Sequence, residues 1–369
     1  MKAKSVIAIM MAALMAAGLA GCGNGGGNTS SKSSQSTSGT SGSSEVKTEN
    51  TDSEAASDLK MVSYFPTAHT YYDEVQQGVE AFAADTGIDV SIQLGADWEQ
   101  STQTQNIEAL VAQGYNAISL YPADASGANG MIDEISGKGV NVVGYGADVS
   151  KPTEQAFCVA TDAKEAAYQA TKAVIEMMGE KGNIINVLEI LEDSNTAKRK
   201  EGVEAAVAEY PDVKIIQEVS GIGSTEEAVT KMTDTLAANA GNVQGIICTG
   251  ANPSIALVSV LSDYYAANPD AEHIYSIGID TDPTLIKGIQ DGVVDATIAQ
   301  NPYGHGYISC MLLKYLNEGY TPKDDSEETY FIDAGYVVVN KDNIDSYAGD
   351  LEEVTQGILD SLTTDYLKK

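Results

Sequence analysis

The chain has 369 residues, more than one hydrophobic core usually organises, so two lobes are expected rather than a single domain. Hydrophobic residues make up 43% of the sequence, which is enough to fill both cores. The formal net charge of -32 argues against nucleic acid and anionic phospholipid head groups as partners, because such a surface repels them. The acidic residues are spread along the chain, as is typical of a solvated, soluble surface.

Residues 1–21 are predicted to be a signal peptide. Two lysines precede an apolar run over residues 6–20, which is too short to span a bilayer. The run ends in Leu19-Ala20-Gly21-Cys22, which resembles a bacterial lipobox and implies that Cys22 is lipidated and becomes the mature N-terminus. Cleavage by ordinary signal peptidase at a small-residue site is the alternative.

Residues 22–58 are expected to form a flexible tether after the lipidated cysteine. Beyond Cys22 the segment is rich in glycine, serine, threonine and asparagine, with almost no apolar residues. Such a composition buries too little apolar surface to offset the entropy that ordering would cost. Ordered structure is therefore expected to begin at Leu59.

From Leu59 onward, short apolar runs alternate with longer segments of helical periodicity, which indicates an α/β protein. The apolar runs are continuous rather than alternating, so they are expected to be strands of parallel sheets buried on both faces. Strands are predicted over residues 61–65, 90–94, 117–121, 140–145, 156–160, 184–189, 214–219, 245–249, 274–279, 296–299 and 336–340. The clearest predicted helices cover residues 72–85, 100–113, 163–178, 195–209 and 225–239.

Each cysteine beyond the lipobox has at least one apolar sequence neighbour, so these cysteines are expected to be buried free thiols. The histidines show no metal-ligand spacing, and there is no Cys-x-x-Cys pair, so neither a metal nor a cofactor is expected. The residues concerned are Cys158, Cys248, Cys310, His69, His273 and His305.

Asp280 and Gln300 stand at the carboxyl ends of two predicted strands that one helix connects. In an open parallel sheet, ligands bind outside these strand ends, so the carboxylate and the amide are expected to face the same ligand. The alternative is that Asp280 merely caps the connecting helix and that Gln300 is an ordinary turn residue.

Residues 59 to about 347 resemble the sugar-binding periplasmic proteins of the ribose and galactose type, which deliver ligand to ATP-driven importers. The most specific match is the pair of strand ends that carry Asp280 and Gln300. Asn252 precedes a helix in the same way as a family asparagine. The resemblance implies that these three side chains hydrogen-bond sugar hydroxyls.

The first predicted loop also resembles that family, which commonly has an Asn-Pro-aromatic-aromatic segment there. The corresponding residues are His69-Thr70-Tyr71-Tyr72, and the resemblance implies that their rings stack on the ligand. A sugar ring has apolar C–H faces and a polar hydroxyl rim, so its site needs aromatic faces together with planar polar groups. The alternative for Tyr71 and Tyr72 is core packing of the first helix.

Departures from the family pattern bear on the substrate. After the fourth strand, ribose-type proteins have an aspartate and an arginine, whereas this chain reads Tyr145-Gly146-Ala147-Asp148, in which Gly146 is a predicted site residue. The sugar-binding arginine of the family's second lobe corresponds to about Ala197. Arg199 is interpreted as structural. Tyr121 replaces an asparagine and adds an aromatic face, while Trp98 either stacks on ligand or anchors the lobe surface. A wider, more aromatic and less charged pocket is predicted, suited to a larger or less hydroxylated ligand than ribose.

The resemblance implies a type I periplasmic binding protein fold: two Rossmann-like α/β lobes with parallel sheets, joined by a multi-strand hinge. The N-terminal lobe is predicted to contain residues 59–161 and 302–332. The C-terminal lobe is predicted to contain residues 162–301 and 333–369.

The expected function is that of a monomeric extracytoplasmic lipoprotein, anchored to the cell membrane by lipid, which hands a sugar-like ligand to the permease subunits of an ABC importer. A sensor that presents the same closed form to a chemoreceptor or histidine kinase is an alternative. A secreted enzyme is another, but the sequence has no Gly-x-Ser-x-Gly elbow, Walker loop or histidine cluster, so no catalysis is expected.

Overall fold

The computed structural model describes residues 59–191 and 193–369. The predicted signal peptide, Cys22 and the predicted tether lie outside these residues. Within the described ranges, no helix combines the length and the apolar character needed to cross a membrane.

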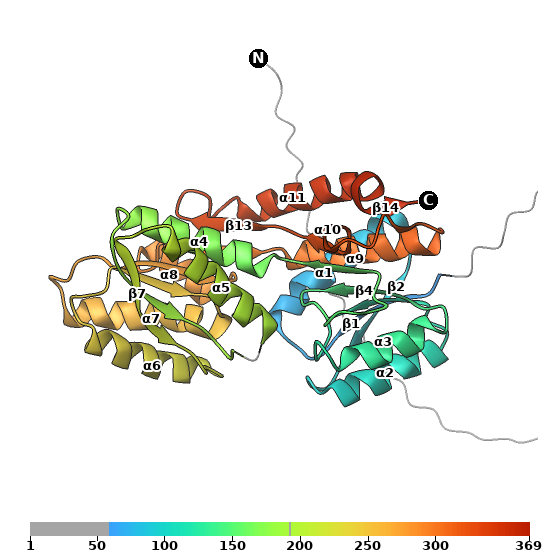
Figure 1. Cartoon of the computed structure of the whole chain (residues 1–369), viewed down its shortest axis with the longest axis horizontal. Coiled ribbons are helices and arrows are strands. Elements are labelled where there is room, and N and C mark those ends of the chain that lie inside the picture. Colours follow the sequence, from blue (N-terminus) through green and yellow to red (C-terminus); the bar gives the residue numbers. More distant parts are fainter. Residues whose placement is uncertain (1–58, 192) are drawn as a thin grey trace, which may run out of the picture. The chain divides into compact units, whose positions relative to one another are not determined.

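The described part of the chain forms two lobes, each built around a six-stranded sheet (Figure 1). The elements of lobe one are β1 (Met61–Phe65), α1 (Thr70–Thr86), β2 (Val90–Leu94), α2 (Gln100–Ala112), β3 (Ala117–Leu120), α3 (Ala128–Ser136), β4 (Asn141–Tyr145), β5 (Phe157–Ala160), α9 (Pro302–Asn317), β11 (Thr321–Pro322), α10 (Glu327–Tyr330) and β12 (Phe331–Asp333). The strands of its sheet are all parallel, in the order β12-β5-β4-β3-β1-β2.

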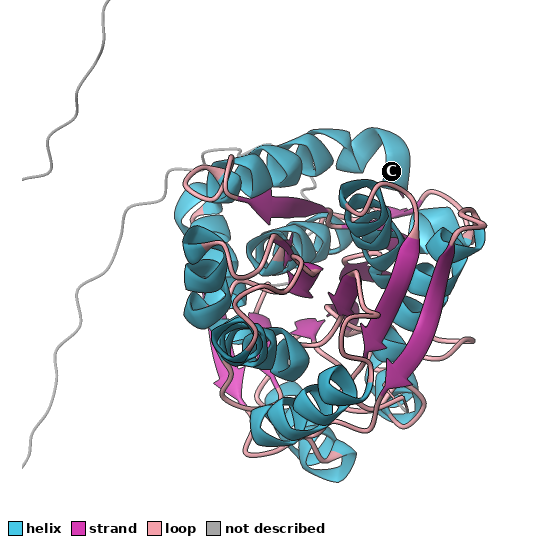
Figure 2. Cartoon of the chain, turned by 90° about the vertical axis from the view of Figure 1, so that its left-hand side faces the viewer, coloured by secondary structure: helices cyan, strands magenta, loops and turns pink. Residues whose placement is uncertain are grey.

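Lobe two repeats this plan. Its elements are α4 (Ala163–Met177), β6 (Gly182–Val187), α5 (Ser194–Ala208), β7 (Val213–Val219), α6 (Thr225–Ala238), β8 (Gly245–Cys248), α7 (Ala251–Ala267), β9 (Tyr275–Ile279), α8 (Pro283–Asp291), β10 (Ala296–Gln300) and β13 (Tyr336–Asn340). The strand order is β13-β10-β9-β8-β6-β7, and only β13 runs antiparallel to its neighbour. Figure 2 shows helices around the strands, which is why the strands read as continuous apolar runs.

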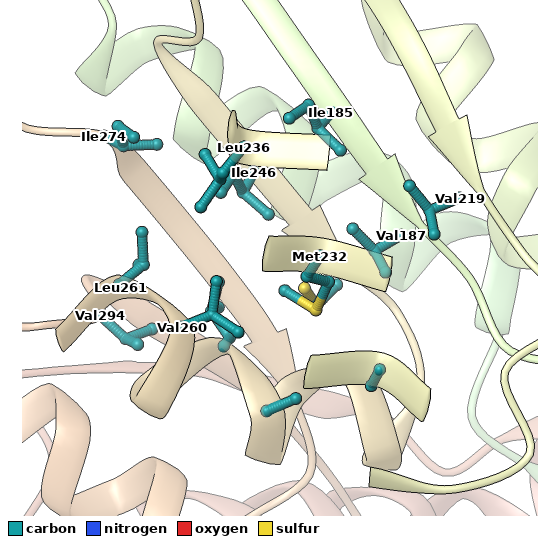
Figure 3. Packing of buried hydrophobic residues seen from close by; sticks show 14 of the residues in the cluster. Ile185, Val187, Val219, Met232, Leu236, Ile246, Val260, Leu261, Ile274 and Val294 are labelled. Carbon is teal, nitrogen blue, oxygen red and sulfur yellow. The ribbon is translucent and has the colours of Figure 1, made fainter. Parts of the chain in front are cut away.

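The hydrophobic core of each lobe is formed by apolar residues of the strands and of the helices that pack against them. In lobe two, Met232 and Leu236 of α6 pack with Ile246 of β8 in a buried cluster that also includes Val260 and Leu261 of α7 (Figure 3). Burying one such side chain contributes about 1.5–3 kcal/mol to stability. The three described cysteines are free and buried, which confirms the prediction of buried thiols.

Helices α1 and α9 of lobe one approach each other unusually closely. A Cβ atom at Gly78 would lie 2.0 Å from the carbonyl oxygen of Tyr303, and one at Gly306 would lie 2.2 Å from that of Val75. Glycine is therefore needed on both helices. This close approach brings the first turn of α1 against the first turn of α9, where Tyr71 and His305 are in contact.

The chain passes between the lobes after β5, after β10 and after β12. Hydrogen bonds tie these crossings together. The Thr161 hydroxyl donates to the carbonyl oxygen of Gly335 at 3.2 Å, and the backbone N–H of Asp162 donates to the Asp333 carboxylate at 3.0 Å. The buried amide of Asn301 donates to the carbonyl oxygen of Ala334 at 2.8 Å.

The C-terminal segment departs from the predicted lobe boundaries. After α11 (Tyr347–Ser361) and a π-helical turn over Leu362–Tyr366, strand β14 (Leu367–Lys368) pairs antiparallel with β11 of lobe one. Leu362 and Leu367 are buried in the core of lobe one. The end of the predicted segment 333–369 therefore packs in lobe one and not in lobe two, because its leucines complete that core.

Candidate functional site

A cavity of about 150 Å³ lies between the carboxyl ends of the two sheets. Both lobes contribute to its wall. The lining residues are His69, Tyr71, Tyr72, Trp98, Tyr121, Gly146, Asn195, Arg199, Asp280 and Gln300. Eight of the nine predicted ligand-binding residues are among them, so the structure brings these eight together.

A second compartment of about 350 Å³ adjoins this cavity. It shares His69, Tyr71, Asp280 and Gln300 with the first. The remaining residues that line it are Asp73, Glu74, Ala251, Ile255, Thr281, Asp282, Pro283 and Pro302. The site is thus an aromatic chamber next to a wider, more acidic one.

The aromatic wall comes from lobe one. Tyr72 is 3% exposed and stacks on Phe65 with ring centroids 5.2 Å apart, so it belongs to the core as well as to the cavity. The Tyr71 and Tyr121 rings meet the Tyr72 ring edge to face, at 5.1 Å and 5.7 Å. Trp98 packs against Tyr121 at 5.4 Å but is 47% exposed, which places it at the rim.

Gly146 follows β4 with a φ angle of +73°. A Cβ atom there would lie 2.5 Å from the Tyr71 hydroxyl and 2.6 Å from the Tyr121 ring. Any other residue would therefore push both tyrosines out of place. The Gly146 carbonyl oxygen also accepts a 3.4 Å hydrogen bond from Asn195 of lobe two.

Asp280 lies just beyond β9 with a φ angle of +69°, a left-handed conformation that is uncommon for residues other than glycine. Gln300 Nε2 donates to Asp280 Oδ1 at 2.6 Å. The N-terminus of α8 is instead capped by Asp282, whose carboxylate accepts from the backbone N–H of Thr284 at 2.7 Å. The alternative role of Asp280 as the helix cap is therefore wrong.

Glu74 of α1 faces lobe two. The Thr281 hydroxyl lies 3.4 Å from Glu74 Oε1 and donates to it across the lobes. Burial raises the pKa of Glu74, and the negative charge of Asp280 raises it further. The second compartment thus contains a carboxyl group for which ionisation is unfavourable.

His305 of α9 lies behind the aromatic wall. Its side chain is 1% exposed, and its Nδ1 atom lies 2.7 Å from the Tyr71 hydroxyl oxygen. Burial lowers the pKa of His305 to about 3, so the imidazole is neutral near neutral pH.

Asn252 is the exception among the predicted site residues. It does not line either compartment. Its side-chain amide donates to Glu189 at 3.1 Å and accepts from the Thr225 hydroxyl at 3.0 Å, which holds it within lobe two. The structure therefore holds the Asn252 side chain within lobe two, and its contact with the ligand stays a prediction.

The sequence interpretation also missed wall residues. Arg199, interpreted as structural, lines the cavity, and its Nε atom is buried without a hydrogen-bond partner among the described residues. Arg199 and Glu74 thus add two charged side chains to the walls of the site. No local motif marks Asn195, Glu74 or His305, since each reaches the site only through the packing of its helix.

Comparison with known proteins agrees with this architecture. Residues 61–321 match the family model described as a periplasmic binding protein domain. The xylitol-binding protein of Mycolicibacterium smegmatis is 23% identical over 317 residues, which cover 84% of this chain and 86% of that protein. The D-apiose import binding protein of Actinobacillus succinogenes is 24% identical over 233 residues, covering 63% and 73%.

Among solved structures, a sugar-binding protein of a sugar ABC transporter from Bacillus halodurans superposes with a TM-score of 0.71 at 21% identity. The superposition covers 79% of this chain and all of that one. The predicted two-lobed fold is thereby confirmed, and the named relatives are binding proteins rather than enzymes, as predicted. Because the family model matches most of the described residues, this chain belongs to the periplasmic binding protein family.

Proposed function

We propose that this chain captures a sugar or a related polyol in the cavity between its lobes and hands it, chemically unchanged, to an ABC importer. The observation that carries the proposal is the wall of Tyr71, Tyr72 and Tyr121 facing the Asp280–Gln300 pair. Aromatic faces suit the C–H faces of a sugar, and a carboxylate with an amide suits its hydroxyl rim.

The size of the chamber supports a ligand built around one ring. An engineered protein cavity of about 150 Å³ binds benzene, so a chamber of similar volume has room for one six-membered ring or a compact acyclic polyol. The adjoining compartment leaves space for a substituent. The names of the xylitol-binding and D-apiose import binding relatives support the same class of small polyhydroxy compounds.

The experiment is a thermal-shift screen of the full chain against pentoses, hexoses, xylitol, myo-inositol, disaccharides and nucleosides. A compound that binds only the native state adds to the free energy of unfolding, by about 2.7 kcal/mol at a hundredfold excess over Kd. The melting temperature rises as a result. We expect a shift with at least one polyhydroxy compound. Shifts with nucleosides alone, or with none of these compounds, would contradict the proposed class.

We further propose that Cys22 carries a lipid that anchors the protein to the cell membrane. The support is the lipobox-like sequence at residues 19–22. The Cys22→Ser variant is expected to leave the membrane fraction and enter the aqueous phase of a detergent separation. A variant that still partitions wholly with detergent would contradict the anchor.

Delivery to an importer rests on membership in the periplasmic binding protein family. Its test is uptake of the compound identified in the screen by cells with and without this gene. Uptake is expected to fall when the gene is absent and to return with the wild-type gene. Unchanged uptake would contradict the transport role without contradicting ligand binding.

A further inference from the structure

The contact between Tyr71 and His305 joins residues 234 positions apart in the chain. It depends on the close packing of α1 against α9 that Gly78 and Gly306 permit. The imidazole Nδ1 atom lies 2.7 Å from the hydroxyl oxygen, while the buried Nε2 atom has no hydrogen-bond partner among the described residues. Within residues 59–191 and 193–369, therefore, only one of the two ring nitrogens has a hydrogen-bond partner.

The burial of His305 decides its protonation. Since the pKa is lowered to about 3, the ring carries a single proton near neutral pH. A proton on Nε2 would leave a buried N–H without an acceptor, which costs about 1–3 kcal/mol. A proton on Nδ1 instead takes part in the hydrogen bond to Tyr71, and it leaves only an acceptor unpaired.

The Nδ1 proton sets the direction of the next hydrogen bond. If the Tyr71 oxygen accepts from His305, the hydroxyl hydrogen of Tyr71 is free to point elsewhere. Tyr71 and Asp280 line the same cavity, and while burial is the main cause that raises the pKa of Tyr71, the negative charge of Asp280 also contributes. The field of that carboxylate attracts the hydroxyl hydrogen, so it favours the orientation into the cavity.

We propose that His305 is a positioning residue that makes Tyr71 a hydrogen-bond donor to the ligand, and that one ligand hydroxyl bridges Tyr71 and Asp280. The proposal rests on the proposed function, since the bridging group belongs to the ligand of that site. A hydroxyl oxygen accepts from Tyr71 while its hydrogen is donated to Asp280. An ionised carboxylate only accepts hydrogen bonds. Each hydrogen bond in the series from His305 to Asp280 therefore runs in the same direction.

This arrangement deepens the ligand assignment. Tyr71 and His305 come from lobe one and Asp280 from lobe two, so a bridging hydroxyl links the lobes. A group that can both accept and donate is required at this place. A free hydroxyl fits, whereas a methyl ether or a deoxy analogue at the same carbon cannot complete the chain.

The first test does not need the ligand. In the full chain labelled with nitrogen-15, correlation spectra between ring nitrogens and carbon-bound protons identify which nitrogen of His305 carries the proton. Comparison with the His305→Asn variant assigns the signals. We expect protonation on Nδ1 alone across the neutral range. A proton on Nε2, or a charged ring, overturns the proposed direction of the Tyr71 hydrogen bond.

The second test uses xylitol as the probe, or the compound with the largest shift in the screen if xylitol gives none. We expect Tyr71→Phe and His305→Leu each to raise Kd at least about tenfold, the effect of losing one hydrogen bond. The double variant should bind no more weakly than Tyr71→Phe alone, because His305 acts through that hydroxyl. His305→Asn, whose amide nitrogen can take the place of Nδ1, should recover most of the affinity.

The control is Tyr307→Phe, on the same helix. It removes a hydroxyl that donates to Asp85 at 2.9 Å and does not line the cavity. It should leave Kd within about twofold of wild type. If His305→Leu remains folded by circular dichroism and binds as well as wild type, the positioning role is wrong. If no compound in the screen binds, both the proposed ligand bridge and the proposed function are wrong. The first test still decides whether Nδ1 of His305 carries the proton.

Discussion

Gln300 donates a 2.6 Å hydrogen bond to Asp280 and so joins the carboxyl ends of the neighbouring strands β9 and β10. A carboxylate offers about four acceptor positions, and Gln300 occupies one of them. Asp280 holds this place with a left-handed backbone, at a φ angle of +69°. Backbone strain of this kind persists where the surrounding structure enforces it, and it is concentrated at functional sites.

The strain at Asp280 leads to a prediction about stability that is separate from binding. Asp280→Gly should be more stable than Asp280→Ala by about 1 kcal/mol, because only glycine adopts positive φ angles without steric cost. Urea unfolding of the two variants measures the difference. An alanine variant that equals or exceeds the glycine variant would show that the left-handed conformation is not maintained.

Glu74 predicts a pH dependence. Its pKa is raised above the ordinary 4.5 by burial first and then by the charge of Asp280, with a smaller contribution from Asp73, while the Thr281 hydroxyl lowers it. Tyr347 also faces this carboxyl group. Because the pKa is raised, Glu74 contributes to the free energy of unfolding below pH 4.5. This contribution is lost as the pH rises through the folded-state pKa.

Glu74→Gln removes that ionisation. The melting temperature of this variant, minus that of wild type, should therefore increase as the pH rises from about 4 to about 7. Asp85→Asn, on the same helix but outside both compartments, serves as the control. A difference for Glu74→Gln that stays constant or shrinks over this range would contradict the interpretation of the Glu74 environment.

Much of the fold could be predicted, because short segments rich in apolar residues mark most of the strands, from the fully buried β1 to the partly exposed β2 and β13. The predicted bounds of β1, β2 and β13 agree with the structure. The short strands β11, β12 and β14 have too few residues to produce a pattern, and their pairing depends on chain segments far away. The return of the C-terminal segment to lobe one could not be predicted for the same reason, because it depends on tertiary packing.

The site was predictable where its residues follow strands or form one loop. Tyr71 and Tyr72 adjoin each other in the sequence, and Asp280 and Gln300 end neighbouring strands. His305 could not be recognised, because its partner is 234 residues away. The hydrogen bond between Asn252 and Glu189 could not be recognised either, because the two residues follow different strands.

Asn301 is expected to be a structural residue of the hinge. Its buried amide donates to the Ala334 carbonyl oxygen and the Thr355 hydroxyl, and its side-chain oxygen accepts from the backbone N–H of Gly304. Asn301→Ala should lower the free energy of unfolding by at least about 2 kcal/mol, since buried groups lose their partners. Denaturant unfolding measures this loss.

The matched control is Asn268→Ala. The side-chain amide of Asn268 is exposed, and in the part of the chain that the structure describes it donates only to the Tyr264 carbonyl oxygen, at the end of its own helix. We expect a change within about 0.5 kcal/mol. Equal losses for the two variants would mean that the hinge contacts of Asn301 contribute nothing specific.

Ligand binding should bring the lobes together. Wall residues come from both lobes, so contacts with a bound ligand favour the arrangement in which the walls face each other. Small-angle X-ray scattering should give a smaller radius of gyration at saturating ligand than without ligand. An unchanged profile at saturation would contradict closure.

The central claim is that one small polyhydroxy ligand binds between the aromatic wall and Asp280. Calorimetric titration of the full chain with the compound identified in the thermal-shift screen tests it most directly, with Asp280→Gly as the comparison. Hydrogen bonds to a charged group contribute about 1.5–3 kcal/mol each, so losing two should raise Kd at least about a hundredfold. The account predicts one site per wild-type chain and this loss in a variant that stays folded; a loss under about threefold would contradict it.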